Sequence, residues 1–275
     1  LAHEATLRER LAVDNARLQV FAADLLDDAG WQQAMAGCSH VAHLASPVPA
    51  RVPKNADEVI VPAPYWVSYP DMVRLCGGEP RIVPCGADAG FKLSPQALDA
   101  AIGARTKWLI LNSPSNPTGV AYTRDELAAL ADVLRGHPQV HVISDDIYAA
   151  LRYDGSSHAT IAQIDTAMRD RTLLIDGVSK AYCMTGWRIG WGAGPTWLIA
   201  AIATIQSQST SNPSSISQAA ALAALEGPDD FIADHNAVFR ERRDWIVSLL
   251  DATPGLACAR PDGAFYVFPS CTGLV

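Results

Sequence analysis

Five polar side chains of the kinds that catalyse reactions stand at or just after the ends of apolar segments. Asn116 follows "KWLILNSPS", Asp145 ends "VHVISD", and Lys180 follows "RTLLIDGVS". Tyr148 comes three residues after Asp145, and Arg188 comes eight residues after Lys180. Because the carboxyl ends of parallel strands meet at one edge of a sheet, we expect these side chains to gather there.

An amine, a carboxylate, a phenol, an amide and a guanidinium in one place suit a phosphorylated pyridine aldehyde better than they suit hydrolysis. The Lys180 amine can form a Schiff base with an aldehyde. The Asp145 carboxylate can keep a pyridine nitrogen protonated, so that the ring accepts electrons. A phenol and an amide can bind a ring hydroxyl, and the fork of an arginine matches a phosphate. An aromatic side chain such as Trp66 can stack on the ring.

Each of these residues also has a simpler interpretation when it is taken alone. Asp145 and Asp146 could end a strand in solvent or form half of a metal site. Lys180 could lie on the surface, and Trp66 could belong to the core. No spacing of potential ligands favours a metal site, and we expect none.

Short apolar segments alternate with amphipathic ones, which predicts an α/β fold with a mostly parallel sheet. The segments that we expect to form strands are 17–24, 40–45, 57–63, 80–85, 106–112, 140–145, 171–177, 187–193 and 263–269. Two helices have clear start signals. Thr123 and Glu126 predict a capping box at the start of 123–136, and Ser94 followed by Pro95 predicts the start of 94–103.

The last third of the chain changes character, because residues 195–251 follow a helical pattern almost throughout. The strand expected at 263–269 then indicates the start of a second, smaller domain. We expect 57–250 to form an incomplete large domain and 251–275 to begin a small C-terminal domain that is truncated at Val275.

Composition excludes several classes of protein. The 275 residues are 49% hydrophobic and carry a formal net charge of -8, which argues against nucleic acid or an anionic membrane as the main partner. No apolar run approaches the roughly 20 residues of a membrane span. The six cysteines are scattered and form no C-x-x-C pair, so we expect reduced thiols and a cytoplasmic location.

Several motifs together resemble the class I aminotransferases, in particular the aspartate aminotransferase group. They are "PAPYWVSYPDM", "NSPSNPTGV", "SDDIY", "SKAYCMTGWRIG" and "SNPSSISQAAALAALEG", in that order, and the resemblance covers about 57–275. It implies the three-layer α/β/α large domain of that family, with a mostly parallel sheet. It also implies the cofactor pyridoxal 5'-phosphate, an amino acid and a 2-oxo acid as substrates, and a homodimer.

The resemblance implies a role for each candidate residue. Lys180 matches the lysine that binds the cofactor and moves the proton, and Asp145 matches the partner of the pyridine nitrogen. Tyr148 and Asn116 match the groups on the ring hydroxyl. The phosphate-binding arginine is matched by Arg188, and the stacking aromatic by Trp66. Gly177 stands where many members have Ser, which removes one phosphate contact, and we expect a cis Asn116–Pro117 bond.

Residues 1–56 resemble a different family, the extended short-chain reductases of the dihydroflavonol-reductase type. The segment "LQVFAADLLDDAGWQQAMAGCSHVAHLASP" carries that resemblance, in which Asp24 lies near the adenine. The Gly-rich turn that would hold a pyrophosphate is absent. We therefore expect a chimera of a reductase fragment and an aminotransferase. The alternatives are an NAD(P)-dependent reductase fragment or an inactive remnant.

Overall fold

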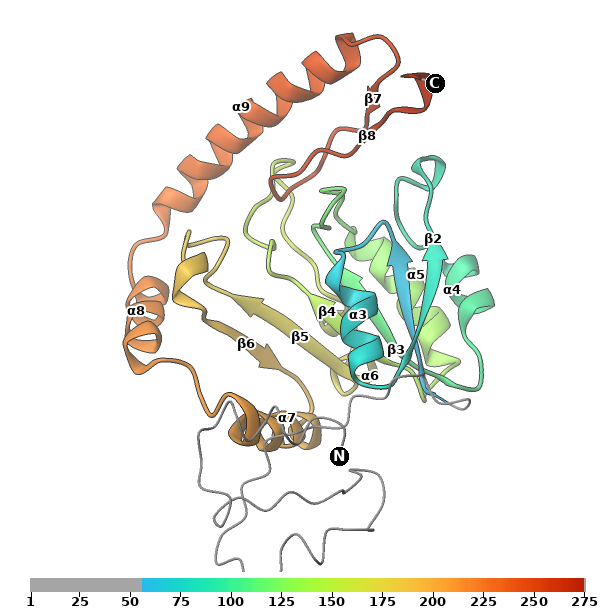
Figure 1. Ribbon diagram of the computed structural model, residues 1–275, viewed down its shortest axis with the longest axis vertical. Helices are drawn as coiled ribbons and strands as arrows, with labels where there is room; N and C mark the ends of the chain where they lie inside the picture. Colours follow the sequence, from blue (N-terminus) through green and yellow to red (C-terminus); the bar gives the residue numbers. More distant parts are fainter. Residues whose placement is uncertain (1–55, 275) are drawn as a thin grey trace, which may run out of the picture. The chain divides into compact units, whose positions relative to one another are not determined.

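A six-stranded sheet is the framework of the chain in the computed structural model, which describes residues 56–274 (Figure 1). Its strands are β1 (Glu58–Ala63), β2 (Glu79–Pro84), β3 (Thr106–Asn112), β4 (His141–Asp145), β5 (Thr172–Gly177) and β6 (Gly190–Ala193). The strand order is β2-β1-β3-β4-β5-β6. All neighbours are parallel except β5 and β6, which are antiparallel. The mostly parallel sheet predicted from the sequence is confirmed.

The chain divides into two compact units, 1–51 and 52–275. The first unit lies outside the described residues. The strands expected at 17–24 and 40–45 lie there too, as do Asp24 and almost all of the segment that resembles a reductase.

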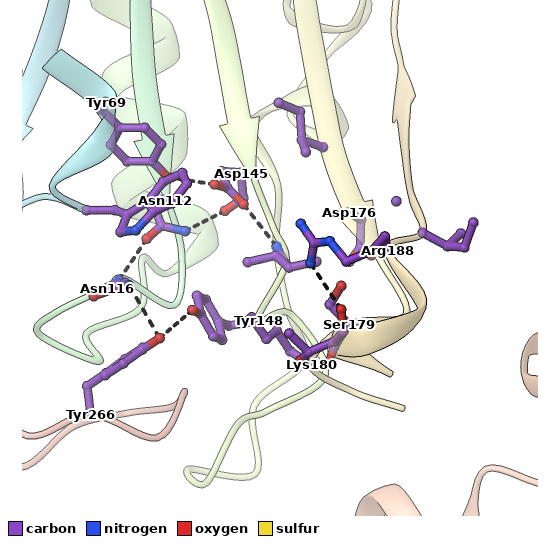
Figure 2. Close-up of a pocket in the computed structure, with 16 residues that line it drawn as sticks. Tyr69, Asn112, Asn116, Asp145, Tyr148, Asp176, Ser179, Lys180, Arg188 and Tyr266 are labelled. Carbon is purple, nitrogen blue, oxygen red and sulfur yellow. Dashed lines mark hydrogen bonds between the residues drawn. The ribbon is translucent and has the colours of Figure 1, made fainter. Parts of the chain in front are cut away.

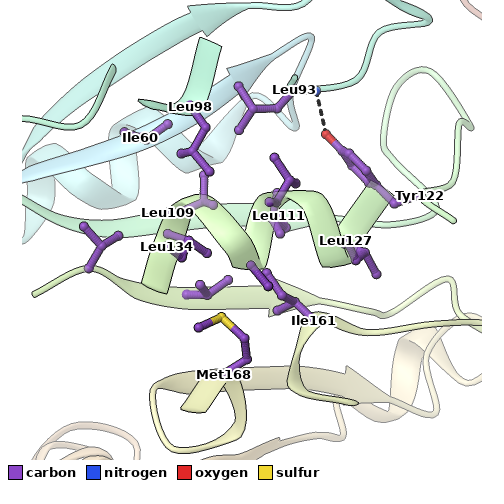
Figure 3. Packing of buried hydrophobic residues seen from close by; sticks show 14 of the residues in the cluster. Ile60, Leu93, Leu98, Leu109, Leu111, Tyr122, Leu127, Leu134, Ile161 and Met168 are labelled. Carbon is purple, nitrogen blue, oxygen red and sulfur yellow. Dashed lines mark hydrogen bonds between the residues drawn. The ribbon is translucent and has the colours of Figure 1, made fainter. Parts of the chain in front are cut away.

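Helices cover both faces of the sheet. Successive residues of each strand point to opposite faces, so each strand contributes apolar side chains to both layers. On one face, Leu109 and Leu111 of β3 pack with α4 (Pro95–Ala101) and α5 (Arg124–Arg135). On the other face, Ile110 packs with Val73 of α3 (Ser68–Leu75). The larger of the two clusters is drawn in Figure 3, where Tyr122 also accepts a 2.8 Å hydrogen bond from the Leu93 amide through its hydroxyl.

The two helix starts predicted from the sequence are confirmed. The Thr123 hydroxyl accepts from the Glu126 amide, and the Glu126 carboxylate accepts from the Thr123 amide, which completes the capping box of α5. The Ser94 hydroxyl accepts from the Ala97 amide at the start of α4. Each cap satisfies amide groups that have no partner inside the helix.

The last third is helical, as the pattern predicted, and consists of α7 (Thr196–Ser209), α8 (Ser215–Glu226) and α9 (Asp230–Ala252). Polar contacts tie helix α9 to the loop after β4 and to the segment that follows α9 in the sequence. Asn236 donates to the Ala150 carbonyl, and Arg243 donates to the Pro261 carbonyl and lies over the Tyr153 ring. None of the helices among residues 56–274 combines the length and hydrophobicity that a membrane span requires.

The strand predicted at 263–269 is wrong for most of its length. Only Pro269 lies in a strand, β8 (Pro269–Ser270), which pairs with β7 (Ala257–Cys258). Two of the preceding residues donate instead to the loops that follow β3 and β4. The Gly263 amide bonds to the Gly119 carbonyl, and the Ala264 amide bonds to the Leu151 carbonyl. A short run of apolar and aromatic residues is thus compatible with a segment that lies along loops as well as with a strand.

We expect Leu109→Ala to lower the free energy of unfolding by about 2–5 kcal/mol, because Leu109 is fully buried between β3 and the α4–α5 layer. Urea denaturation followed by circular dichroism measures this. Leu75→Ala is the matched control, since Leu75 is 61% exposed on α3 and its truncation is expected to cost less than about 0.5 kcal/mol. Equal losses in the two variants would contradict the packing described.

Candidate active site

A cavity of about 510 Å³ opens at the carboxyl ends of β3, β4 and β5 (Figure 2). The candidate residues named from the sequence, Trp66, Asn116, Asp145, Tyr148, Lys180 and Arg188, all line it. They come from five separate parts of the chain and are brought together by the sheet. In Figure 2, Tyr69, Asn112 and Asn116 lie on one side of the cavity and Asp176, Ser179 and Arg188 on the other.

Asp145, the last residue of β4, is held by two donors. The Tyr69 hydroxyl donates to its Oδ2 atom at 2.6 Å, and the Ile147 amide donates to Oδ1 at 3.3 Å. Burial raises the pKa of this carboxyl above its ordinary value, while the Tyr69 hydrogen bond acts in the opposite direction. Asp145 forms no ion pair within the described part of the chain. It is therefore a half-buried acid that a cationic donor in the cavity could pair with.

Asn112, the last residue of β3, fixes the end of β3 beside the end of β4. It lies opposite Asp145 in the β3–β4 register, and its Nδ2 atom donates to the Asp145 carbonyl at 2.9 Å. Its Oδ1 atom accepts from the Asn116 amide at 2.7 Å. One side chain thus positions both the β4 end and the following loop, in which Asn116–Pro117 is cis, as expected.

Tyr148 and Asn116 meet on a third residue, Tyr266. The Tyr148 and Tyr266 hydroxyls lie 2.6 Å apart, and the Asn116 Nδ2 atom donates to the Tyr266 hydroxyl at 3.3 Å. Burial, followed by the contact with Tyr266, raises the pKa of Tyr148 well above its ordinary value. Tyr148 is therefore a neutral phenol that can donate or accept one hydrogen bond toward the cavity.

Lys180 reaches the cavity from the loop after β5 and is flanked by aromatic rings. Its Nζ atom lies 5.9 Å from the centre of the Tyr148 ring and 5.8 Å from that of Phe265. Lys180 is half-buried and lines the cavity, which favours the site over a fully exposed surface position. A flanked amine in this position can reach an aldehyde bound in the cavity.

Arg188 lies in a backbone conformation that few residues other than glycine adopt, with φ of 58°. One of its guanidinium nitrogens donates to the Thr185 carbonyl at 3.0 Å, and the Thr185 hydroxyl donates to the Ser179 carbonyl at 2.9 Å. These bonds connect the arginine to the loop that carries Lys180. The guanidinium retains further N–H donors that an anion in the cavity can use.

Steric crowding explains why a glycine, Gly177, stands three residues before Lys180. A Cβ atom on Gly177 would lie 2.8 Å from the Ile189 carbonyl oxygen and 2.9 Å from the Gly190 Cα atom. The β6 backbone therefore leaves no space for a serine at this position.

Trp66 does not belong to the core, because it is 40% exposed and lines the cavity. Its ring stands edge-on to that of Tyr69, with an angle of 89° and 5.4 Å between the ring centres. Its indole is thus held at the mouth of the cavity, next to the tyrosine that binds Asp145.

Sequence reasoning missed several residues that line the cavity: Tyr69, Asn112, Asp176, Ser179 and Tyr266. Two of them carried a readable signal. Asn112 ends an expected strand just as Asp145 does, and Tyr69 follows Trp66 by three residues at the start of a helix. Tyr266 carried none, because its segment was expected to be a strand elsewhere. Within residues 56–274, no group of three His, Cys, Asp or Glu residues could hold a metal ion.

The comparisons with known proteins all point to the same family. A family described as "Aminotransferase class I and II" matches residues 35–274. An aspartate/prephenate aminotransferase of Cereibacter sphaeroides is 60% identical over 219 residues, which are 80% of this chain and 55% of that protein. A probable aspartate/prephenate aminotransferase of Rhizobium leguminosarum is 50% identical over 248 residues, or 90% of this chain and 62% of that protein.

Solved structures are similar to the same part of the chain. The crystal structure of the aspartate aminotransferase from Rhizobium meliloti matches with a TM-score of 0.79 and 50% identity, over 80% of this chain and 55% of that one. The aspartate aminotransferase from Thermus thermophilus with maleate matches with a TM-score of 0.73 and 41% identity, over 79% and 56%. The chain spans about half the length of these relatives.

We expect Tyr69→Phe to raise the pKa of Asp145 further, because the hydrogen bond that it removes favours the ionised carboxylate. A ¹³C carboxyl titration followed by NMR measures the change. Tyr65→Phe is the control, since Tyr65 packs near Tyr69 but has no hydrogen bond to Asp145. An unchanged titration of Asp145 in Tyr69→Phe would show that this contact does not act on the carboxyl.

Proposed function

The chain belongs to the class I and II aminotransferases, and from this premise we propose that the protein transfers an amino group from an amino acid to a 2-oxo acid with pyridoxal phosphate as cofactor. The observation that supports the proposal most is that Lys180 and Asp145 line one cavity. Both residues were named from their strand-end positions, and no other described lysine lines that cavity.

The residues of the cavity fit the cofactor. A volume of about 510 Å³ lies in the range that small-molecule sites have, roughly 300–1,000 Å³. Asp145 is a half-buried carboxyl without an ion-pair partner among the described residues, and a protonated pyridine nitrogen would supply such a partner. Arg188 has donors left for a phosphate after its bond to the Thr185 carbonyl.

When bound, the cofactor supplies an aldehyde that amines can join and a ring that accepts electrons. In this proposal Asp145 would bind the ring nitrogen, and Tyr148 and Asn116 would bind the ring hydroxyl. Arg188 would bind the phosphate. Trp66, at the mouth of the cavity, would cover the face of the ring.

Lys180 has two tasks in this proposal. It would hold the cofactor through its amine in the resting protein, and once displaced it would carry a proton to and from the α-carbon of the substrate. The Tyr148 and Phe265 rings beside its Nζ atom limit the positions that the amine can take. This restriction keeps the base near the reacting atoms.

The names of the relatives support aspartate as the amino donor and prephenate as one acceptor. The homodimer that the resemblance implies stays a prediction, which sedimentation velocity can test. In its favour, α7 buries none of its residues, and Trp197, Ile205 and Ile216 of α7 and α8 are 56%, 69% and 73% exposed. Such apolar helix surfaces are typical of subunit contacts.

A chimeric origin of residues 1–56 also stays a prediction. The family match begins at residue 35, so the segment that the aminotransferase family does not account for is 1–34. One uninterrupted genomic read across this region tests whether the two parts are joined in the gene.

We expect borohydride to fix pyridoxal phosphate onto Lys180, and peptide mapping by mass spectrometry locates the adduct. Lys180→Ala should abolish the label, whereas Lys107→Ala should retain it, since Lys107 is exposed and pairs with Asp57 outside the cavity. Aspartate added before borohydride should reduce labelling of Lys180, because the substrate amine displaces the lysine. Full labelling of Lys180→Ala would refute the assignment.

A further inference from the structure

Asp176 is a carboxylate in the cavity that none of the roles above uses. It lies near the end of β5, one residue before Gly177, and its side chain lines the cavity. Figure 2 shows it on the same side as Ser179 and Arg188, where we place the phosphate of the cofactor. A negative group at the anion end of a site calls for an explanation.

The surroundings of Asp176 leave its charge unbalanced. Within residues 56–274, its side chain accepts one hydrogen bond, from the adjacent Gly177 amide at 2.7 Å. The charged groups that face it are the Asp145 and Asp146 carboxylates at the end of β4 and the His158 ring from the loop beyond, with the acids opposing its ionisation and the histidine favouring it. It forms no ion pair with Lys180 or Arg188, the two cations that line the cavity.

Burial, together with the two neighbouring acids, raises the pKa of Asp176 to about 6. The side chain is therefore mostly neutral below that pH and negative above it. Asp145 also has a raised pKa, but the Tyr69 hydroxyl and the Ile147 amide support its ionised form. For Asp176 the described residues supply one hydrogen bond of this kind, from the Gly177 amide, together with the electrostatic effect of the His158 ring.

We propose that Asp176 weakens the binding of phosphate-bearing ligands at the Arg188 end of the cavity when it is ionised, so that acidification strengthens the binding of pyridoxal phosphate. The inference rests on the proposed function, because it takes the cofactor phosphate to lie beside Arg188. Like charges in a partly dry cavity repel each other more strongly than in bulk water.

The test compares dissociation constants for pyridoxal phosphate, measured by equilibrium dialysis, near pH 5.5 and near pH 8. At the higher pH, Asp176→Asn should bind on the order of tenfold more tightly than the unmodified protein, since a charge repulsion of about 1.4 kcal/mol is removed. At the lower pH the two should agree within about twofold, because Asp176 is then largely neutral. Because the two proteins are compared at the same pH, protonation of the free ligand affects both constants equally.

Two controls make the comparison specific. Asp170→Asn removes the same charge at the other end of β5, on an exposed residue outside the cavity, and should leave both constants unchanged. Pyridoxal without phosphate should bind equally to Asp176→Asn and the unmodified protein. Asp176→Ser, which keeps an acceptor for the Gly177 amide, serves as the second variant if Asp176→Asn does not fold.

The outcomes separate this inference from the proposed function. Labelling of Lys180 by the cofactor, combined with equal affinities of Asp176→Asn and Asp170→Asn near pH 8, would overturn the inference alone. Absence of any cofactor binding in all variants would overturn both proposals. A pH-dependent gain seen in Asp176→Asn with pyridoxal phosphate and not with pyridoxal supports the inference.

Discussion

The parallel register of β3, β4 and β5 is the constraint on which the cavity depends. Asn112 lies opposite Asp145, and Asp145 lies opposite Ile175, so three strands end at nearly the same level. The bond from the Asn112 side chain to the Asp145 carbonyl fixes that level on one side. A slip of one residue in β4 would turn Asp145 to the other face of the sheet and remove it from Tyr69 and from the cavity.

The sequence predicted those parts of the fold that depend on local patterns. The strand at 106–112 has the predicted bounds, and the α5 capping box forms as its residues indicate. Each of these signals is contained within a short stretch of sequence. The gathering of Asn116, Asp145 and Lys180 was also predictable, since it follows from the rule that parallel strands end at one edge. Predicting this gathering did not require the residue-by-residue pairing of the strands.

Contacts between distant segments were not predictable in this way. The bond from Tyr69 to Asp145 joins α3 to β4, and nothing in the residues near either one specifies it. The segment 263–269 was misread because a short run of apolar and aromatic residues does not reveal which backbone groups will accept its hydrogen bonds. Asp176 escaped notice for a third reason, because the effect of burial on a carboxyl depends on the finished cavity.

The position of Tyr266 on one side of the cavity has a consequence for the order in which the cavity forms during folding. Its hydroxyl contacts Asn116 and Tyr148, which precede it by 150 and 118 residues along the chain. The strands that carry the other cavity residues can pair while the polypeptide is still growing, but this side of the cavity cannot close until the segment that carries Tyr266 has left the ribosome. Contacts between residues so far apart in the sequence also form slowly. A nascent chain therefore passes through a stage at which the sheet edge is formed and one side of the cavity is still open.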